Sequence, residues 1–118
     1  MADILSADKS VLDYADGLKR FSNVAMLYQK HLKKFPADQT CNQLVEAMNQ
    51  GDFEEAFRQA HTLKGIAGNL SLAGLYQICI PFVEALRGGA DIEKAKELLP
   101  ELEVAYHRAV DEITSLEF

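Results

Sequence analysis

The sequence RQAHTLKGIAGNL, residues 58–70, has apolar side chains at helical spacing and yet carries Gly65 and Gly68. A glycine inside a helix lowers the stability of that helix by about 1 kcal/mol relative to alanine. A whole domain has only about 5–15 kcal/mol of net stability. Two glycines placed one and two turns after a histidine therefore need an explanation.

A helical wheel through this region separates a core face from a neighbouring stripe. At about 100° per residue, the apolar side chains on one side are Phe53, Ala56, Phe57, Ala60, Leu63, Ala67 and Leu70. The neighbouring stripe, outside this core face, holds His61, Lys64, Gly65 and Gly68. We therefore expect a solvent-accessible His61 beside a flat surface. Two explanations of the glycines remain open: they clear a docking surface for another protein or a phosphate group, or they let a neighbouring helix approach closely.

Apolar residues recur at three- and four-residue spacing along nearly the whole chain, and no segment has the pattern of a strand. This periodicity predicts helices over residues 10–20, 24–35, 38–49, 53–69, 72–87 and 92–116. The connections are short, which favours antiparallel neighbours. The sequence predicts one all-α domain over residues 1–118: an antiparallel up-and-down four-helix bundle with an additional short N-terminal helix.

Capping residues and prolines mark the expected helix ends. The residues that precede predicted helices as N-caps are Asp38, Asp52, Ser71 and Asp91. Asp52 is followed three positions later by Glu55, which is the pattern of a capping box. Pro81 lies inside a predicted helix, and Pro100 is expected either to kink the last helix or to begin a new one.

Composition restricts the classes of partner. The chain has 118 residues and a formal net charge of -6, with 48% hydrophobic and 25% charged residues. This balance is typical of a globular domain. The acidic excess disfavours nucleic acid as a partner, because no dense basic face offsets the repulsion from phosphates.

The sequence also predicts a cytoplasmic protein without a membrane span. The first ten residues, MADILSADKS, lack the basic and apolar pattern of a signal peptide. No apolar run approaches the roughly 20 residues that a membrane span needs. Cys41 and Cys79 lie in different predicted helices beside apolar residues, so we expect buried free thiols rather than a disulfide or a metal pair.

His61 is the strongest candidate for chemistry. A neutral imidazole nitrogen is a good nucleophile near pH 7. The sequence pairs no serine or cysteine nucleophile with a base, and it has no strand followed by a glycine-rich phosphate loop. His31 and His107 are not at metal-ligand spacing from His61, so we expect no metal site. We expect half of an active site, completed by a partner, and no autonomous kinase or ATPase activity.

At these residues the chain resembles a known family. AHTLKGIAGNLSLAGL, residues 60–75, is similar to the signature of histidine-containing phosphotransfer (HPt) domains: a histidine, an apolar residue two positions on, Lys-Gly, a small residue and a second glycine. The upstream sequence GLKRFSNVAMLYQKHLKKF, residues 17–35, resembles the N-terminal helices of the family. The resemblance covers most of the chain.

This resemblance implies a four-helix-bundle core that relays phosphoryl groups in multistep two-component signalling. His61 would be the phosphoacceptor, Lys64 the phosphate-stabilising lysine, and Gly65 the glycine that opens the surface. The partner would be the receiver domain of a response regulator, a hybrid histidine kinase, or both. The receiver would bring the divalent metal, so the chain needs no cofactor, and a monomer is expected. The alternative is a binding-only helical module, a degenerate HPt domain that docks a receiver or kinase without chemistry.

One position departs from the family pattern. Many members carry a Gln or Glu on the following helix that hydrogen-bonds the second imidazole nitrogen. Hairpin register puts Val83 at or near that position, and valine cannot form this bond. Glu84 is adjacent, with Gln77 and Tyr76 further up the helix, so the partner could be one of these neighbours, water, or nothing.

Overall fold

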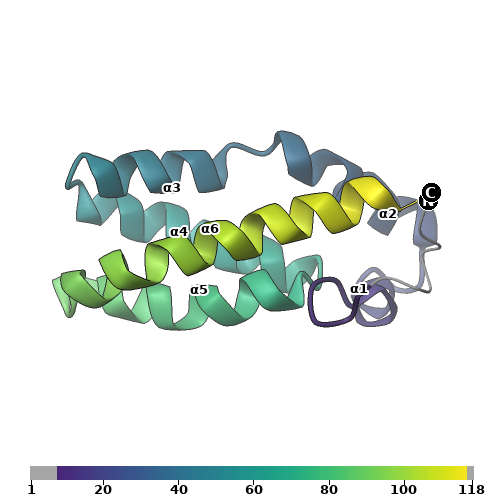
Figure 1. The fold of residues 1–118 in the computed structure, drawn as a ribbon. Coiled ribbons are helices and arrows are strands. Elements are labelled where there is room, and N and C mark those ends of the chain that lie inside the picture. Colours follow the sequence, from purple (N-terminus) through teal and green to yellow (C-terminus); the bar gives the residue numbers. More distant parts are fainter. Residues whose placement is uncertain (1–7, 117–118) are drawn as a thin grey trace.

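The computed structural model describes residues 8–116, and all regular elements in that range are helices. The α-helices are α1 (Tyr14–Arg20), α2 (Ala25–Lys34), α3 (Thr40–Asn49), α4 (Phe53–Asn69), α5 (Ala73–Leu86) and α6 (Ile92–Ser115), as Figure 1 shows. Short 3-10 turns follow α2 at Phe35–Ala37 and α5 at Arg87–Gly89. The all-α prediction is therefore confirmed for the described part of the chain.

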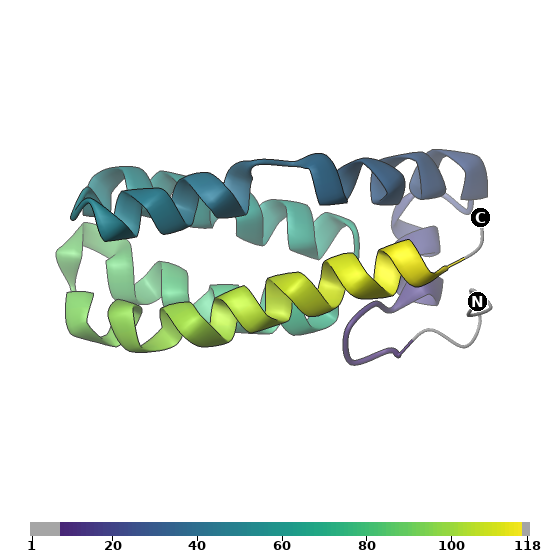
Figure 2. The same cartoon turned by 45° about the horizontal axis from the view of Figure 1, so that its top comes forward.

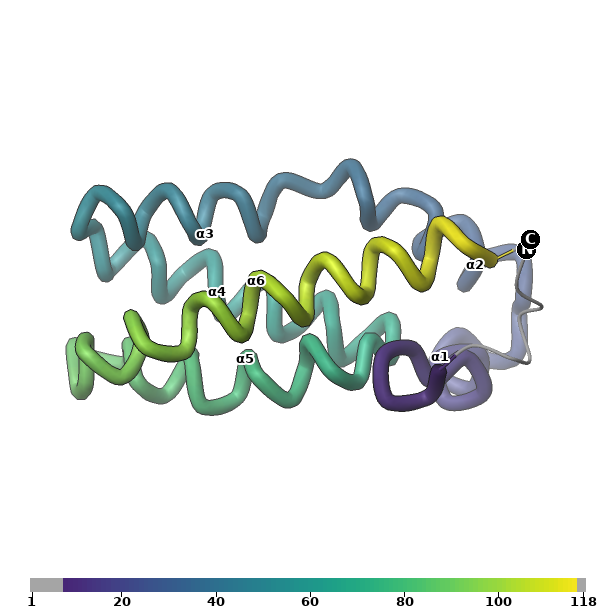
Figure 3. The backbone as a smooth tube through the Cα atoms, viewed as in Figure 1, coloured from purple at the N-terminus to yellow at the C-terminus, as the bar shows by residue number. Residues whose placement is uncertain are grey.

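The helices form an elongated bundle that measures 40 × 26 × 21 Å. Helices α3, α4, α5 and α6 lie side by side with roughly aligned axes (Figures 1 and 2). The tube in Figure 3 reverses at each connection between these four helices, so that α4, α5 and α6 each run opposite to the helix before them. Helix α2 continues along the line of α3, and the 24 residues of α6 run alongside both (Figure 2).

The core is built from the apolar stripes that the periodicity predicted. On α4 the four buried residues are Ala56, Ala60, Leu63 and Ala67. The larger side chains of the same core include Leu32, Leu44, Leu75, Phe82 and Leu102, all fully buried. Burying one such side chain contributes about 1.5–3 kcal/mol. The three alanines of this stripe let neighbouring helices approach α4 closely.

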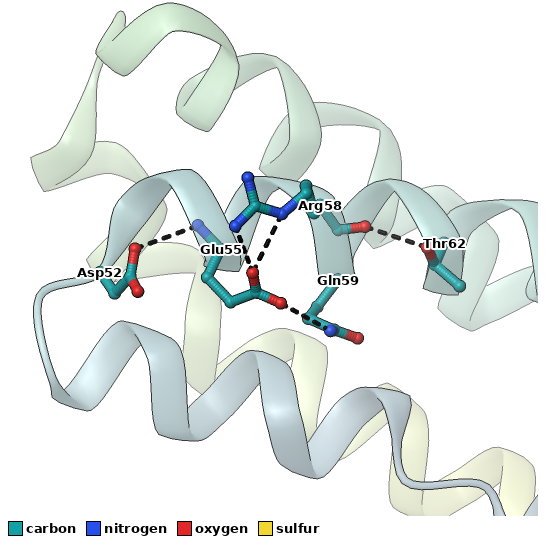
Figure 4. Close-up of polar contacts among 5 residues, drawn as sticks. All are labelled: Asp52, Glu55, Arg58, Gln59 and Thr62. Carbon is teal, nitrogen blue, oxygen red and sulfur yellow. Dashed lines mark hydrogen bonds and ion pairs between the residues drawn. The ribbon is translucent and has the colours of Figure 1, made fainter.

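Two predicted N-caps are confirmed, and the capping box is only half formed. The Asp52 carboxylate accepts a hydrogen bond from the Glu55 N–H at 3.2 Å, and Asp91 caps α6 in the same way. The Glu55 side chain does not return this bond. It accepts from Arg58 and Gln59 instead, as Figure 4 shows. The Asp52 N–H donates to a carbonyl of α3 at 2.9 Å, which leaves Glu55 free to pair further along its own helix.

Ser71 does not cap α5, which corrects the prediction. The N-cap of this helix is Leu72. The backbone at Ser71 is left-handed, with φ of 57°, and it reverses the chain between α4 and α5. In that conformation the Ser71 hydroxyl donates to the Asp16 carboxylate of α1 at 2.6 Å. The serine therefore ties α1 to the α4–α5 turn.

Two other helix starts also differ from the prediction. The first helix begins at Tyr14 rather than near residue 10, because Asp13 caps it through the Asp16 N–H at 3.2 Å. Asp38 does accept a hydrogen bond from the Thr40 N–H at 2.8 Å, but the N-cap of α3 is Gln39. Asp38 thus closes a turn after the 3-10 segment instead of capping the helix.

Both interior prolines are accommodated without a new helix. Helix α5 runs through Pro81 and α6 runs continuously through Pro100, so the possibility of a new helix at Pro100 is excluded. Both prolines are exposed. A proline removes one helical hydrogen bond. On an exposed face the carbonyl that loses this bond can be solvated by water.

The two cysteines are free and buried, as predicted. Burial raises the pKa of each thiol, of Cys41 and of Cys79, to about 12. They are therefore neutral packing residues near pH 7. No helix within residues 8–116 combines the length and apolarity needed to cross a membrane.

The N-terminal helices are joined to the bundle through Tyr28 of α2. Its side chain is fully buried, and its hydroxyl donates to the Leu70 carbonyl, at the end of α4, at 2.7 Å. Burial raises the pKa of Tyr28, which keeps this donor protonated. The rings of Tyr14 and Phe21 pack 5.1 and 5.2 Å from it. Gly17 of α1 lies against the same side chain, where an added Cβ would overlap the Tyr28 hydroxyl.

We predict that Gly17→Ala destabilises the protein by about 1–3 kcal/mol, because the added methyl group displaces the buried Tyr28 ring or pushes α1 away. Chemical denaturation followed by circular dichroism measures this free energy of unfolding. Gly65→Ala is the control, since a Cβ there meets no atom within 4 Å. Equal stability of the two variants would contradict the close packing of α1 on Tyr28.

Candidate functional site

His61 is the central residue of α4 and is exposed. This position follows from the rotation of the helix. The buried stripe of Ala60, Leu63 and Ala67 faces the core, so residue 61 points away from it. The structure therefore agrees with the helical-wheel prediction that His61 is accessible to solvent.

Three side chains lie one helical turn from His61. Lys64 follows it and is half-buried. Phe57 precedes it, with ring centroids 6.1 Å apart and planes at 84°. Arg58 also precedes it, is exposed, and forms an ion pair with Glu55 (Figure 4). The histidine thus has one cation on each side along the helix.

The charges of Arg58 and Arg87 are each balanced by a glutamate three positions earlier in the chain. Hydrogen bonds from Gln59 and Arg58 hold the pKa of the Glu55 carboxyl below its ordinary value. At the end of α5, the Arg87 guanidinium lies 3.0 Å from the Glu84 carboxylate and lowers its pKa in the same way. Both pairs are formed between residues three positions apart on the surface.

Lys64 differs from these arginines. No carboxylate within residues 8–116 lies within 4.0 Å of its ammonium group. The positive charge of Lys64 helps to lower the pKa of Glu84 through space, so Lys64 acts electrostatically on a residue of α5. Lys64 is therefore available to a negative group added one turn away.

The two glycines have different environments. A Cβ built on Gly65 meets no atom within 4 Å, so this position is open surface. A Cβ built on Gly68 would lie 3.0 Å from Cε1 of Tyr76, on α5. Such a separation is tighter than ordinary carbon contacts. Gly68 therefore lies closely packed against a neighbouring side chain, whereas Gly65 is bare surface. The docking role of both glycines stays a prediction.

The register of α4 against α5 places His61 level with Val83. Gly68 faces Tyr76, and Phe57 lies under Arg87. Because the two segments are antiparallel, residues between these two contacts pair in reverse order, and His61 falls opposite Val83. Val83 is fully buried. This agrees with the hairpin register expected from the sequence.

The polar neighbours considered for the imidazole are engaged elsewhere or set apart. Tyr76 packs on Gly68, and Glu84 bonds to Arg87 at 3.0–3.3 Å. Gln77 lines a pocket beside Gly68, further along α4. Among the described residues, no side chain or backbone group forms a hydrogen bond with the imidazole ring of His61.

The other histidines lie in different settings. His31 is half-buried against Phe21, with ring centroids 5.2 Å apart. His107 on α6 packs against Tyr106 at 5.5 Å. Within residues 8–116 no group of three or more His, Cys, Asp or Glu side chains is arranged to hold a metal ion.

A comparison with protein families matches the Hpt domain to residues 37–114. The match covers more than half of the chain and includes α3, α4, α5 and all but the last residue of α6, with His61, Lys64 and Gly65. Helices α1 and α2, whose sequence also resembles the family, lie before it. Searches of curated proteins and of solved structures found no match.

We expect Gly65→Ala to raise the free energy of unfolding by about 0.4–1 kcal/mol, because alanine has the better helix propensity and meets open space. Gly68→Ala should raise the free energy of unfolding by less, or lower it, because the added methyl group must displace the Tyr76 ring. Thermal melting of both variants, made in the same helix, measures the difference. A larger gain at Gly68 than at Gly65 would refute the assignment of Gly68 to packing.

Proposed function

The chain belongs to the Hpt domain family, and we propose that it relays a phosphoryl group between His61 and receiver-domain aspartates in multistep two-component signalling. The observation that carries this proposal is the exposed His61 in the middle of α4, with Lys64 one turn on and open surface at Gly65. The antiparallel up-and-down arrangement of α3 to α6 is the proposed frame for this site.

The transfer is a displacement at phosphorus. The lone pair of one His61 ring nitrogen attacks the phosphorus of a receiver aspartyl phosphate while the other nitrogen carries the ring proton. An N–P bond forms as the P–O bond breaks, and the aspartate carboxylate leaves with the electron pair. In the onward step an aspartate of a second receiver attacks phosphorus, and the imidazole nitrogen is the leaving group.

This chain contributes position and charge to that step. Phosphoryl transfer requires mainly in-line placement and neutralisation of the oxygens. Lys64, half-buried and without an ion pair in the described chain, is the proposed source of positive charge. The proposed receiver partner brings a divalent metal, so the proposal gives this chain no cofactor and no ATPase or kinase activity of its own.

The proposed partners are a response-regulator receiver domain, a hybrid histidine kinase, or both. The open surface at Gly65 supports this choice, because a partner's backbone can approach the helix there without meeting a side chain. The proposed relay works in the cytoplasm, with the chain as a monomer and without contact to nucleic acid or membrane.

A binding-only module is the second candidate. The buried Val83 favours it, because this residue leaves the imidazole without the hydrogen bond that many family members form. The intact His61, Lys64 and Gly65 favour transfer. Incubation with a phosphorylated receiver domain separates the two, because only transfer moves the label to this chain.

We predict that His61→Gln abolishes labelling by a phosphorylated receiver, because glutamine offers no nucleophilic ring nitrogen. Gel autoradiography after mixing with the labelled receiver measures the outcome. His107→Gln is the matched control, with an exposed histidine of α6 replaced, and it should be labelled like the parent chain. Undiminished labelling of the His61 variant would place the phosphoryl group elsewhere.

We expect Lys64→Ala to slow transfer or shorten the phosphohistidine lifetime several-fold without altering the fold. A solvent-accessible charge pair contributes only about 0–1 kcal/mol, so loss of the lysine should not abolish transfer. Rapid-quench kinetics and the decay of isolated phosphoprotein supply the two measurements. Lys94→Ala, at an exposed lysine of α6, is the control. If neither quantity changes, Lys64 is an ordinary surface residue.

A further inference from the structure

A row of four side chains connects the end of α5 to His61. The Glu84 carboxylate accepts from Nε and Nη2 of Arg87 at 3.0–3.3 Å. The Arg87 guanidinium carbon lies 5.2 Å from the centre of the Phe57 ring. The Phe57 ring in turn lies 6.1 Å from the imidazole of His61. Phe57 is therefore in contact both with the proposed phosphoacceptor and with a cation that Glu84 holds in place.

Phe57 is restrained at three points. It is half-buried and packs against the core cluster at the edge of the bundle. A guanidinium over an aromatic face is attracted by the negative face of the ring. The plane of the Phe57 ring meets the plane of the His61 imidazole at 84°, an edge-to-face arrangement that aromatic pairs prefer. Since the two residues are four positions apart on α4, the helix itself brings them together.

The imidazole, in contrast, has no polar restraint from this chain. Within residues 8–116 no hydrogen bond holds the ring, and the residue level with it on α5 is the buried Val83. In-line transfer requires the attacking nitrogen to point at phosphorus, and an unrestrained side chain spends only part of its time in that orientation. A contact that limits rotation of the imidazole would therefore raise the rate of the transfer step itself.

We propose that Phe57, held in place by Arg87, sets the orientation of the His61 imidazole in place of a hydrogen-bond partner on α5. This inference rests on the proposed phosphotransfer function. Phe57 acts through His61 and is a positioning residue; it supplies no proton and no charge to the reaction. Glu84 supports the arrangement by holding the guanidinium over the ring.

A docking role for Phe57 gives different kinetics from a positioning role. An apolar contact with the receiver would change the receiver concentration at half-maximal rate. An orienting contact made before the receiver arrives would change the maximal rate at saturating receiver and leave the half-saturating concentration unaltered. The two roles are therefore separable in one set of measurements.

The test uses single-turnover transfer from phosphorylated receiver over a range of receiver concentrations. Phe57→Leu keeps an apolar side chain and removes the ring, and it should lower the maximal rate roughly three- to tenfold, the range that corresponds to the extra energy of an aromatic pair. Phe57→Tyr keeps the ring and should restore the parent rate. Arg87→Gln should lower the maximal rate by a smaller factor.

Arg58→Gln is the matched control. Arg58 is also ion-paired with a glutamate three positions away and lies one turn from His61, but it is not stacked on Phe57. Its replacement should leave the maximal rate unchanged. Thermal melting of each variant corrects the rates to the folded fraction, so a loss of stability is not counted as a loss of rate.

A measurement without any receiver tests orientation directly. Three-bond couplings about the Cα–Cβ bond of His61, measured by NMR, should indicate one dominant rotamer in the parent chain and in Phe57→Tyr. In Phe57→Leu they should move towards averaged values. Unchanged couplings together with an unchanged maximal rate in Phe57→Leu would overturn the inference, as would a shift in half-saturation alone.

Failure of the proposed function is distinguishable from failure of this inference. If the parent chain takes no label from a receiver, phosphotransfer is rejected, and the couplings still decide whether Phe57 orients His61. If the parent chain is labelled and Phe57→Leu transfers equally fast, phosphotransfer remains and the positioning role is rejected.

Discussion

The rotation of α4 about its own axis is the constraint on which the site depends. Ala56, Ala60, Leu63 and Ala67 are fully buried, and only one rotation of the helix buries all four. That rotation leaves His61 outside the core. The small alanines also let the flanking helices approach, which brings the end of α5 within reach of the residues that precede the histidine. A charged residue in place of Leu63 would therefore damage the site as well as the core.

The surroundings of His61 offer few charged or polar groups that could take part in a reaction. Arg58 and Arg87 are each neutralised by a glutamate three positions away, and such exposed pairs add at most about 1 kcal/mol to stability. Lys64 has no ion pair among residues 8–116. Gly65 leaves bare helix beside it. A surface of this kind suits a reaction in which a second protein brings the reactive phosphoryl group and the groups that activate it.

Local signals predicted α4 well. Asp52 caps this helix as expected, and the helix runs over Phe53–Asn69, in agreement with the periodicity. The prediction succeeded because the cap and the apolar spacing both depend on residues within this one helix. The prediction failed where a side chain bonds to a residue far away in the sequence. Ser71 has the chemistry of an N-cap, but its hydroxyl bonds to Asp16, 55 positions away, once the left-handed turn points it at α1. No local rule anticipates a partner so distant.

The sequence by itself determined that the chain is helical, which face of α4 is buried and hence that His61 is exposed, since all three depend on side-chain spacing along one helix. The tertiary structure alone decided what the glycines meet and what holds the site. It set Gly68 against Tyr76, left Gly65 open and placed Arg87 over Phe57. These contacts join two helices, and their register is determined by how the buried side chains of the whole bundle fit together.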